Sequence, residues 1–333
     1  MRIAILGAGF AGLATAWHIL KNTPASSVTV IDKQGVGCGA SGVSAGLLHP
    51  YTGVKAKKSK EGSECVASTE LLLNEASEAL GRPVFKKNGL VRLAASIDQE
   101  QHFQECAKLN SDVHWLNENS VQELVPGVTA STGIYIESAI SVYPNLYMKG
   151  LWKACKRKGA IFLRKEVSSL QELNEFDLII CCLGSGFCNI AELSNLPLSL
   201  LKGQILELPW PNELPHLKTS VSSEVYMVMS ENNNSCFVGS TFERNFTSAA
   251  ANIEYASSII LPKLIKFYPA LKDISAINCR AGIRITAPNR EPLLKKVNHN
   301  CYVFSGLGSK GLLYHSITAE RLLSILGFNV SLN

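Results

Sequence analysis

A glycine-rich turn, directly after an apolar N-terminal segment, constrains the fold of this chain most. Met1–Leu6 predicts a strand, Gly7-Ala8-Gly9-Phe10-Ala11-Gly12 a tight turn, and the residues beyond a helix, which a second strand at Val28–Ile31 follows. In such a unit the glycines permit the turn, the approach of a pyrophosphate and close helix packing. Asp32 stands where a carboxylate can accept hydrogen bonds from a ribose. The turn predicts a dinucleotide site and leaves NAD and FAD both open.

Composition sets the broad class of protein. The 333 residues include 32 basic and 27 acidic side chains, and a net charge of +5 permits an anionic substrate without requiring nucleic acid. The ten cysteines show no CxxC pair and no zinc spacing, which indicates thiols in a reducing compartment, without structural disulfides or metal. No apolar run has the length of a membrane span, and the first strand leaves no room for a cleavable signal. We therefore expect a soluble cytoplasmic protein without a membrane partner.

A second glycine-rich turn lies near the other end of the chain. Cys301–Ser305 predicts a strand, Gly306-Leu307-Gly308-Ser309-Lys310-Gly311 repeats the GxGxxG spacing, and Tyr314–Leu326 predicts a helix. Between the two turns, the continuous apolar run Asp177–Leu183 is typical of a strand buried in a parallel sheet. Both turns could belong to one sheet and meet one cofactor from two sides.

Two further segments are unusual in composition. The stretch from Gly35 to Pro50 is dense in small residues, which favours close approach of backbone to another group over a flexible surface loop. The run Lys55-Ala56-Lys57-Lys58-Ser59-Lys60 is typical of a solvated loop. A mobile lid or a contact for an anionic substrate is the alternative for this run.

Taken in order, these segments resemble the D-amino-acid oxidase-like flavoproteins, which include glycine oxidase and monomeric sarcosine oxidase. The resemblance covers nearly the whole chain. Its segments are GAGFAG with Asp32, GASGVSAGLL at 39–48, YPNLYMKGLWKACKRKGA at 143–160, DLIICCLGSG at 177–186, LKGQILEL at 201–208, FVGSTFE at 237–243, AGIRITAPNREPLL at 281–294 and FSGLGSKGL at 304–312. The last segment is most similar to the oxidase half of the bifunctional enzymes that finish 5-methylaminomethyl-2-thiouridine in tRNA, although Lys310 stands where arginine is usual.

The resemblance implies an α/β fold with two parts. A discontinuous Rossmann-like FAD-binding domain would use residues 1–80, 141–200 and 276–333. A substrate domain with a mainly antiparallel sheet would use residues 81–140 and 201–275. The cofactor would be FAD, bound non-covalently, because no cysteine matches the position of covalent attachment in sarcosine oxidase.

The resemblance also implies which residues bind FAD. The first turn would hold the pyrophosphate, with Asp32 on the ribose; the small-residue segment would line the ribityl chain and the ring; the second turn would lie by the pyrimidine. The predicted cofactor residues are Gly7, Gly9, Phe10, Ala11, Gly12, Asp32, Lys33, Ala40, Ser41, Gly42, Ala45, Gly46, Leu47, Val167, Gly184, Gly306, Gly308, Ser309, Lys310 and Gly311.

Three residues are predicted to act on the substrate. Arg284 matches the family arginine that clamps a substrate carboxylate, a task suited to a guanidinium fork, with a structural ion pair as the alternative. Lys310 could add a second positive contact, or bond only to the flavin. Tyr226 falls near the family's active-site tyrosine, with strand packing as the alternative. Arg280 and His49 are weaker candidates.

Three functions follow from these residues. The first is a small-molecule oxidase of glycine, sarcosine or D-amino acids, which transfers hydride from the substrate to the flavin. Oxygen then reoxidises the flavin and yields hydrogen peroxide. The second is a stand-alone tRNA-modifying oxidase, which removes carboxymethyl from carboxymethylaminomethyluridine. The third is a non-catalytic FAD-binding protein, suggested by departures from the family pattern at Asn289, Lys295 and Met229-Ser230. The sequence does not give the oligomeric state.

Overall fold

Two large sheets organise the computed structural model, which describes residues 1–328. The first has six strands in the order β11-β2-β1-β12-β19-β18. Their bounds are Ile161–Leu163, Ser27–Ile31, Arg2–Leu6, Leu178–Cys181, Cys301–Ser305 and Leu293–Lys296. All are parallel except the edge strand β18. The carboxyl ends of the parallel strands therefore meet along one edge of this sheet, where ligands bind in such folds.

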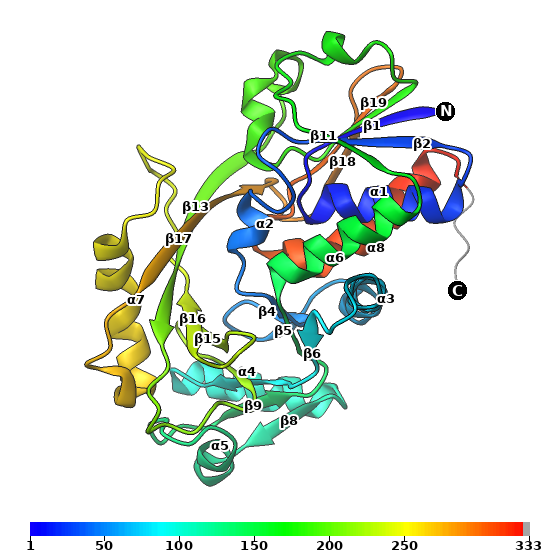
Figure 1. The fold of residues 1–333 in the computed structure, drawn as a ribbon. Coiled ribbons are helices and arrows are strands. Elements are labelled where there is room, and N and C mark those ends of the chain that lie inside the picture. Colours follow the sequence, from blue (N-terminus) through cyan, green and yellow to red (C-terminus); the bar gives the residue numbers. More distant parts are fainter. Residues whose placement is uncertain (329–333) are drawn as a thin grey trace.

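Four helices cover one face of the six-stranded sheet. They are α1 (Phe10–Asn22), α3 (Gly62–Leu80), α6 (Pro144–Arg157) and α8 (Gly311–Ile325). Helix α1 packs on both α6 and α8, and α3 packs on the same two helices (Figure 1). Their apolar side chains form one core with β1, β2 and β12. The opposite face is covered by the segment between β12 and the second sheet, which contains the short turns Gly184–Asn189 and Ala191–Leu193.

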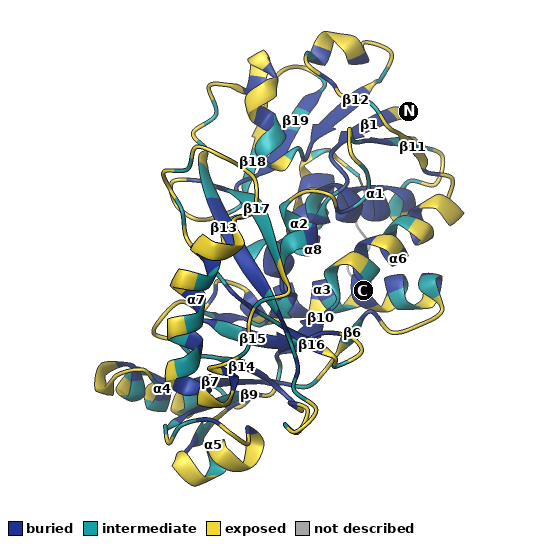
Figure 2. Cartoon of the chain, turned by 60° about the vertical axis from the view of Figure 1, so that its left-hand side comes forward, coloured by how far each residue is buried: buried dark blue, intermediate teal, exposed yellow. Residues whose placement is uncertain are grey.

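The second sheet has eight strands in the order β17-β13-β16-β15-β14-β7-β9-β8. Their bounds are Asn278–Thr286, Ser199–Pro209, Ser235–Gly239, Tyr226–Met229, Ser220–Ser222, Leu90–Leu93, Gly133–Ile136 and Val113–Leu116. Every neighbouring pair is antiparallel except β14 and β7. Helix α7 (Ile253–Phe267) packs its apolar side on this sheet, and its outer side is exposed, as are the outer sides of α4 (Ile97–Leu109) and α5 (Glu118–Leu124) (Figure 2).

Small elements connect the two sheets. Helix α2 spans Ala40–Val43, and the strands β3 (Leu47–Leu48), β10 (Ile140–Val142) and β6 (Phe85–Lys86) form a three-stranded sheet. Strands β4 (Tyr51–Thr52) and β5 (Lys57–Lys58) pair with each other, so part of the lysine-rich run is an ordered hairpin. No helix within residues 1–328 is long and apolar enough to cross a membrane.

The predicted α/β fold, with a parallel sheet and a mainly antiparallel one, is confirmed. Strand β17 was missed by the sequence analysis, although Cys279, Ala281, Ile283 and Ile285 alternate with polar residues and Gly282 along it, as in a half-buried strand. Helix α8 begins at Gly311 rather than at Tyr314, directly after the second glycine turn. The domain limits stay a prediction; β17 lies within the predicted range 276–333, whose last five residues are outside the described part of the chain.

Candidate active site

A cavity of about 640 Å3 lies where the two sheets meet. From the six-stranded sheet it is lined by the residues that follow β1, β2, β12 and β19. From the eight-stranded sheet it is lined by residues of β17 and β15 and by Ser240 and Phe242, which follow β16. The carboxyl edge of the parallel sheet thus faces the antiparallel sheet across one cavity.

The first glycine turn forms one wall by close backbone contact. Gly7 has a φ of +102°, and a Cβ there would overlap the carbonyl oxygen of Cys182. A Cβ on Gly12 would overlap the carbonyl oxygen of Gly7, so this glycine allows α1 to pack on the turn. Helix α1 begins at Phe10, whose N–H donates to the Oγ of Ser41 at 3.1 Å. The next N–H groups of this first turn favour an anion such as a pyrophosphate.

Asp32 holds this turn in place. One carboxylate oxygen accepts from the backbone N–H of Ala8 at 3.0 Å. The other accepts from the N–H groups of Gln34 and Gly35 at 2.8 and 2.9 Å. Asp32 also lines the cavity, and a carboxylate has further acceptor positions for a ribose.

The second glycine turn forms the opposite part of the same wall. Gly306 and Gly308 have φ values of +76° and +55°, which glycine adopts without strain. The whole run 306–313 lines the cavity, and α8 begins within it. Helix N–H groups here would stabilise negative charge on a reduced ring. The two turns and two helix starts fit a long dinucleotide such as FAD.

The structure brings most predicted cofactor residues to this cavity. Those that line it are Gly7, Gly9, Phe10, Ala11, Asp32, Ala40, Ser41, Ala45, Gly46, Leu47, Gly184, Gly306, Gly308, Ser309, Lys310 and Gly311. Four do not. Lys33 pairs with Glu166 on the surface at 2.9 Å, and Val167 lies in the core behind the sheet. Gly12 and Gly42 instead allow backbone to pack closely.

Arg284 projects from β17 into the cavity. Its Nη2 donates to the Oγ of Ser240 at 3.0 Å, and its guanidinium lies 5.3 Å from the ring centre of Phe242. A Cβ on Gly203 would come within 2.5 Å of Nη2, so this glycine leaves room for the guanidinium. Burial lowers the pKa of Arg284 from its ordinary value. No carboxylate of residues 1–328 pairs with Arg284, so the alternative of a structural ion pair is not observed. Its guanidinium is therefore available to an anion in the cavity.

Tyr226 and Lys310 also line the cavity. Tyr226 begins β15 opposite Gly239, and burial raises its pKa while the nearby Arg284 and Ser240 act in the other direction. Its phenol therefore stays protonated and can donate a hydrogen bond. Lys310 lies on the cofactor side, with its Nζ 5.6 Å from the ring centre of Tyr314.

Of the two weaker candidates, only His49 lines the cavity. Its Nδ1 is buried without a hydrogen-bond partner, and burial lowers its pKa to about 3, with the charge of Arg92 acting in the same direction. Arg280 instead donates to the carbonyl of Gly42 at 3.4 Å and lies 4.3 Å from the ring centre of Phe237. Arg92 and Gln99 also line the cavity, and the sequence analysis missed both. For Arg92 the available signal was a charged residue inside the otherwise apolar run GLVRLA.

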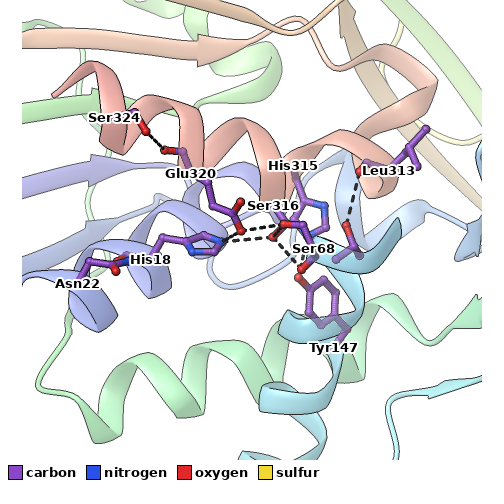
Figure 3. A network of polar contacts seen from close by, with 10 residues as sticks. His18, Asn22, Ser68, Tyr147, Leu313, His315, Ser316, Glu320 and Ser324 are labelled. Atoms are coloured by element: carbon purple, nitrogen blue, oxygen red, sulfur yellow. Dashed lines mark hydrogen bonds and ion pairs between the residues drawn. The ribbon is translucent and has the colours of Figure 1, made fainter. Parts of the chain in front are cut away.

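A buried polar network supports the first turn from behind (Figure 3). Nδ1 of His315 donates to the carbonyl of Leu312 at 3.0 Å, so its Nε2 accepts from the hydroxyl of Tyr147 at 2.6 Å. Both rings contact Phe10, which lines the cavity. Alongside, His18 meets the hydroxyl of Ser316 at 3.2 Å, and Ser68 donates to Ser316 and Glu320. Burial lowers the pKa of His18 to about 4 and that of His315 to about 3, so both rings are neutral near pH 7.

Two strand–glycine–helix units line one side of the cavity, the cofactor wall, and define a dinucleotide-binding protein. The other side is formed by the eight-stranded sheet and carries Arg284, Tyr226 and Arg92; we name it the substrate wall after its proposed role. Residues 2–324 match the family model of FAD dependent oxidoreductases. The chain belongs to this family, and its cofactor is FAD.

Known proteins resemble the chain along almost its whole length. It is 23% identical over 350 residues to the tRNA 5-methylaminomethyl-2-thiouridine biosynthesis bifunctional protein MnmC of Nitrosospira multiformis, covering 95% of the chain and 55% of the relative. It thus spans about half the length of that protein. It is 24% identical over 336 residues to human D-aspartate oxidase, and the match covers 97% of the chain and 94% of that protein. The crystal structure of glycine oxidase from Geobacillus kaustophilus superposes with a TM-score of 0.84 at 19% identity. The superposition covers 100% of the chain and 96% of that structure, which supports the fold.

Proposed function

We propose that this FAD-dependent oxidoreductase oxidises the C–N bond of an amino-acid-type amine, of the glycine, sarcosine or D-amino-acid class. One observation carries the proposal. Arg284 is an arginine without a carboxylate partner in the described chain, and it faces the glycine turns across the cavity. A guanidinium fork binds a carboxylate in two hydrogen bonds and fixes its orientation.

The residues of the chain would act mainly by positioning. FAD, when bound, supplies the acceptor for the hydride that leaves the α-carbon, and oxygen regenerates it with release of hydrogen peroxide. Arg284 would hold the substrate carboxylate, and Ser240 would hold Arg284 by accepting from Nη2. The protonated Tyr226 hydroxyl would donate to the same carboxylate or exclude water beside it. The amine enters neutral, and water then hydrolyses the imine product to an oxo acid and ammonia or an amine.

The experiment is anaerobic bleaching of the bound flavin. Glycine, sarcosine and D-amino acids are added in turn, and bleaching by at least one supports the proposal. Arg284→Ala should keep the yellow flavin and lower kcat/KM by about 100-fold or more, because an interaction of about 3 kcal/mol with the carboxylate is lost. Arg82→Ala, which removes a surface ion pair with Glu231, is the matched control. Unchanged kinetics in Arg284→Ala would contradict the clamp.

A tRNA-modifying oxidase is the second candidate. The observation that favours it is the exposed lysine run: Lys55, Lys57, Lys58 and Lys60 are all exposed and follow Gly53 and Val54, which line the cavity. A curated relative carries a tRNA-modification name, although the chain spans only half of it. Bleaching only by tRNA that carries carboxymethylaminomethyluridine would favour this function. No bleaching by any amine or tRNA would favour the non-catalytic alternative.

A further inference from the structure

A second arginine faces the cavity from the far side of the substrate wall. Arg92 lies on β7, is 7% exposed and lines the same cavity as Arg284. In the strand order, β7 and β17 are separated by five spacings, roughly 24 Å measured along the sheet at about 4.8 Å each. This path follows the sheet and is an upper limit to the separation of the two strands. Because four strands lie between β7 and β17, we assign Arg92 and Arg284 to different parts of the cavity.

The charge of Arg92 has no counter-charge in the described chain. Its Nη1 donates to the carbonyl of Tyr51 at 3.0 Å and its Nη2 to that of Gly53 at 2.8 Å. No carboxylate of residues 1–328 pairs with it. Burial lowers its pKa to about 10, so it stays charged at neutral pH. The two carbonyls and the Phe103 ring, whose centre lies 5.2 Å from the guanidinium, are neutral partners. They compensate the buried charge only in part, so an anionic ligand beside Arg92 would be favourable.

The other polar groups of this region suit an anion. Two acidic residues line the cavity: Asp32 is engaged with the first glycine turn, and Glu224 pairs with Lys266 at 3.1 Å. His49 is neutral and holds a buried Nδ1 without a partner, which can donate in the appropriate tautomer. Gln99 donates to the carbonyl of Val54 at 2.8 Å, so this part of the wall is fixed in place.

We propose that the substrate is an elongated amine with two anionic groups: an amino-acid carboxylate held by Arg284, and a second carboxylate or phosphate at the end of its tail, held by Arg92 and His49. This deepens the proposed function and rests on it for the role of Arg284. The alternative is that Arg92 only braces the turn Tyr51–Val54 through its two carbonyl contacts.

Binding of thioether analogues tests this independently of turnover. Each probe has a carboxymethylthio group, whose sulfur replaces the amine, and a tail that ends either in a carboxylate or in the matching amide. The tails run from two to about twelve methylenes, so that the longest can span roughly the 24 Å between the strands of Arg284 and Arg92. Dissociation constants are measured by calorimetry on the flavin-loaded protein. We expect at least one tail length at which the acid binds 10- to 100-fold more tightly than its amide. No preference for the acid at any length would overturn the proposal. A tail ending in phosphate, compared with the carboxylate, tells which anion fits better.

Variants separate recognition from bracing. Arg92→Gln should reduce the acid-to-amide ratio to about one while changing amide binding less than 3-fold; an equal loss for both probes would overturn the proposal. Because Arg92→Gln could fail to fold, Arg92→Lys, which keeps the charge, is measured too and should retain a clear acid preference. Arg82→Gln on the surface is the control for loss of one positive charge. Arg284→Ala should weaken acid and amide alike. If these results hold but no amine bleaches the flavin, the proposed oxidation fails while the second anion site stands.

Discussion

The two walls of the cavity are built in different ways. The cofactor wall is made of backbone: two glycine turns, two helix starts and Asp32 binding three N–H groups. The substrate wall is made of single side chains on separate strands, among them Arg284 on β17, Tyr226 on β15 and Arg92 on β7. Backbone geometry demands particular residues at fixed spacing, whereas one side chain on a strand can change while the fold stays. The cofactor is therefore common to the family and the substrate is not.

The largest expected effect is that of Gly7→Ala, which should disrupt the first glycine turn of the cofactor wall. The added methyl overlaps the carbonyl oxygen of Cys182 at a φ of +102°, so we expect about 3 kcal/mol or more of lost stability and little bound flavin. Thermal unfolding and the ratio of flavin to protein absorbance measure both. Gly159→Ala is the control: its φ is +92°, but nothing lies within 4 Å of the added carbon. It should cost about 1 kcal/mol and keep the flavin. Equal losses in the two variants would contradict the contact argument.

The second largest effect is expected from acid, which should lower the free energy of unfolding through the two buried histidines behind the cofactor wall, His18 and His315. The folded-state pKa values of His18 and His315, about 4 and about 3, lie below the unfolded value near 6.5. Between these values the unfolded chain binds more protons, so the free energy of unfolding falls as pH drops below about 6.5 and is unchanged above it. By pH 4 each histidine lowers the free energy of unfolding by about 3 kcal/mol.

Melting curves from pH 8 to pH 4 measure this dependence. His18→Gln should flatten the slope below pH 6.5, because a titrating group is removed from the network. His299→Gln, at an exposed position, should not. A slope that is the same in His18→Gln as in the unmodified protein would show that the acid sensitivity arises elsewhere.

The smallest expected effect is that of Gly203→Ala, which should change catalysis through the substrate wall while stability and flavin binding are kept. The added methyl comes within 2.5 Å of Nη2 of Arg284 and must displace the guanidinium, so we expect kcat/KM to fall by about 10- to 100-fold with the flavin retained. Gly186→Ala, where the nearest atom lies at 3.6 Å, should leave kcat/KM within about 2-fold. If Gly203→Ala lost its flavin instead, the two walls would not be separable as described.

The same difference explains what could be predicted from the sequence. The glycine turns and the parallel strands followed from patterns within short segments, whereas the two-part fold with its mainly antiparallel sheet followed from the family resemblance. Arg284 was singled out only through the family resemblance, because the alternation of apolar residues along β17 predicts a strand but does not distinguish Arg284 from any other polar residue on it. Gly203 and Ser240 gave no local signal: their roles depend on the pairing of β13 with β17 and of β13 with β16, which joins distant segments.

Lys33 and Val167 show the limit of an assignment by family motif. Both were assigned to the cofactor from their place in a family motif, and neither lines the cavity. Lys33 follows Asp32 directly, but its side chain points outward to Glu166. Val167 is an apolar residue at a position that the core fills. Their roles toward FAD stay a prediction.

The pairing of β17 with β13 has a consequence for how such a protein can diverge. Leu201 lies opposite Arg284, and successive side chains on β17 point to opposite faces. Insertion of one residue before Arg284 would turn it away from the cavity and present Ile283 in its place. Insertion of two would restore the parity. An odd change of length in this strand therefore turns Arg284 away from the cavity unless a β-bulge absorbs it, and an even change moves Arg284 along the strand by roughly 7 Å for two residues. Exchanges at fixed length, and changes in loops beyond the strand ends, alter the substrate wall without this displacement.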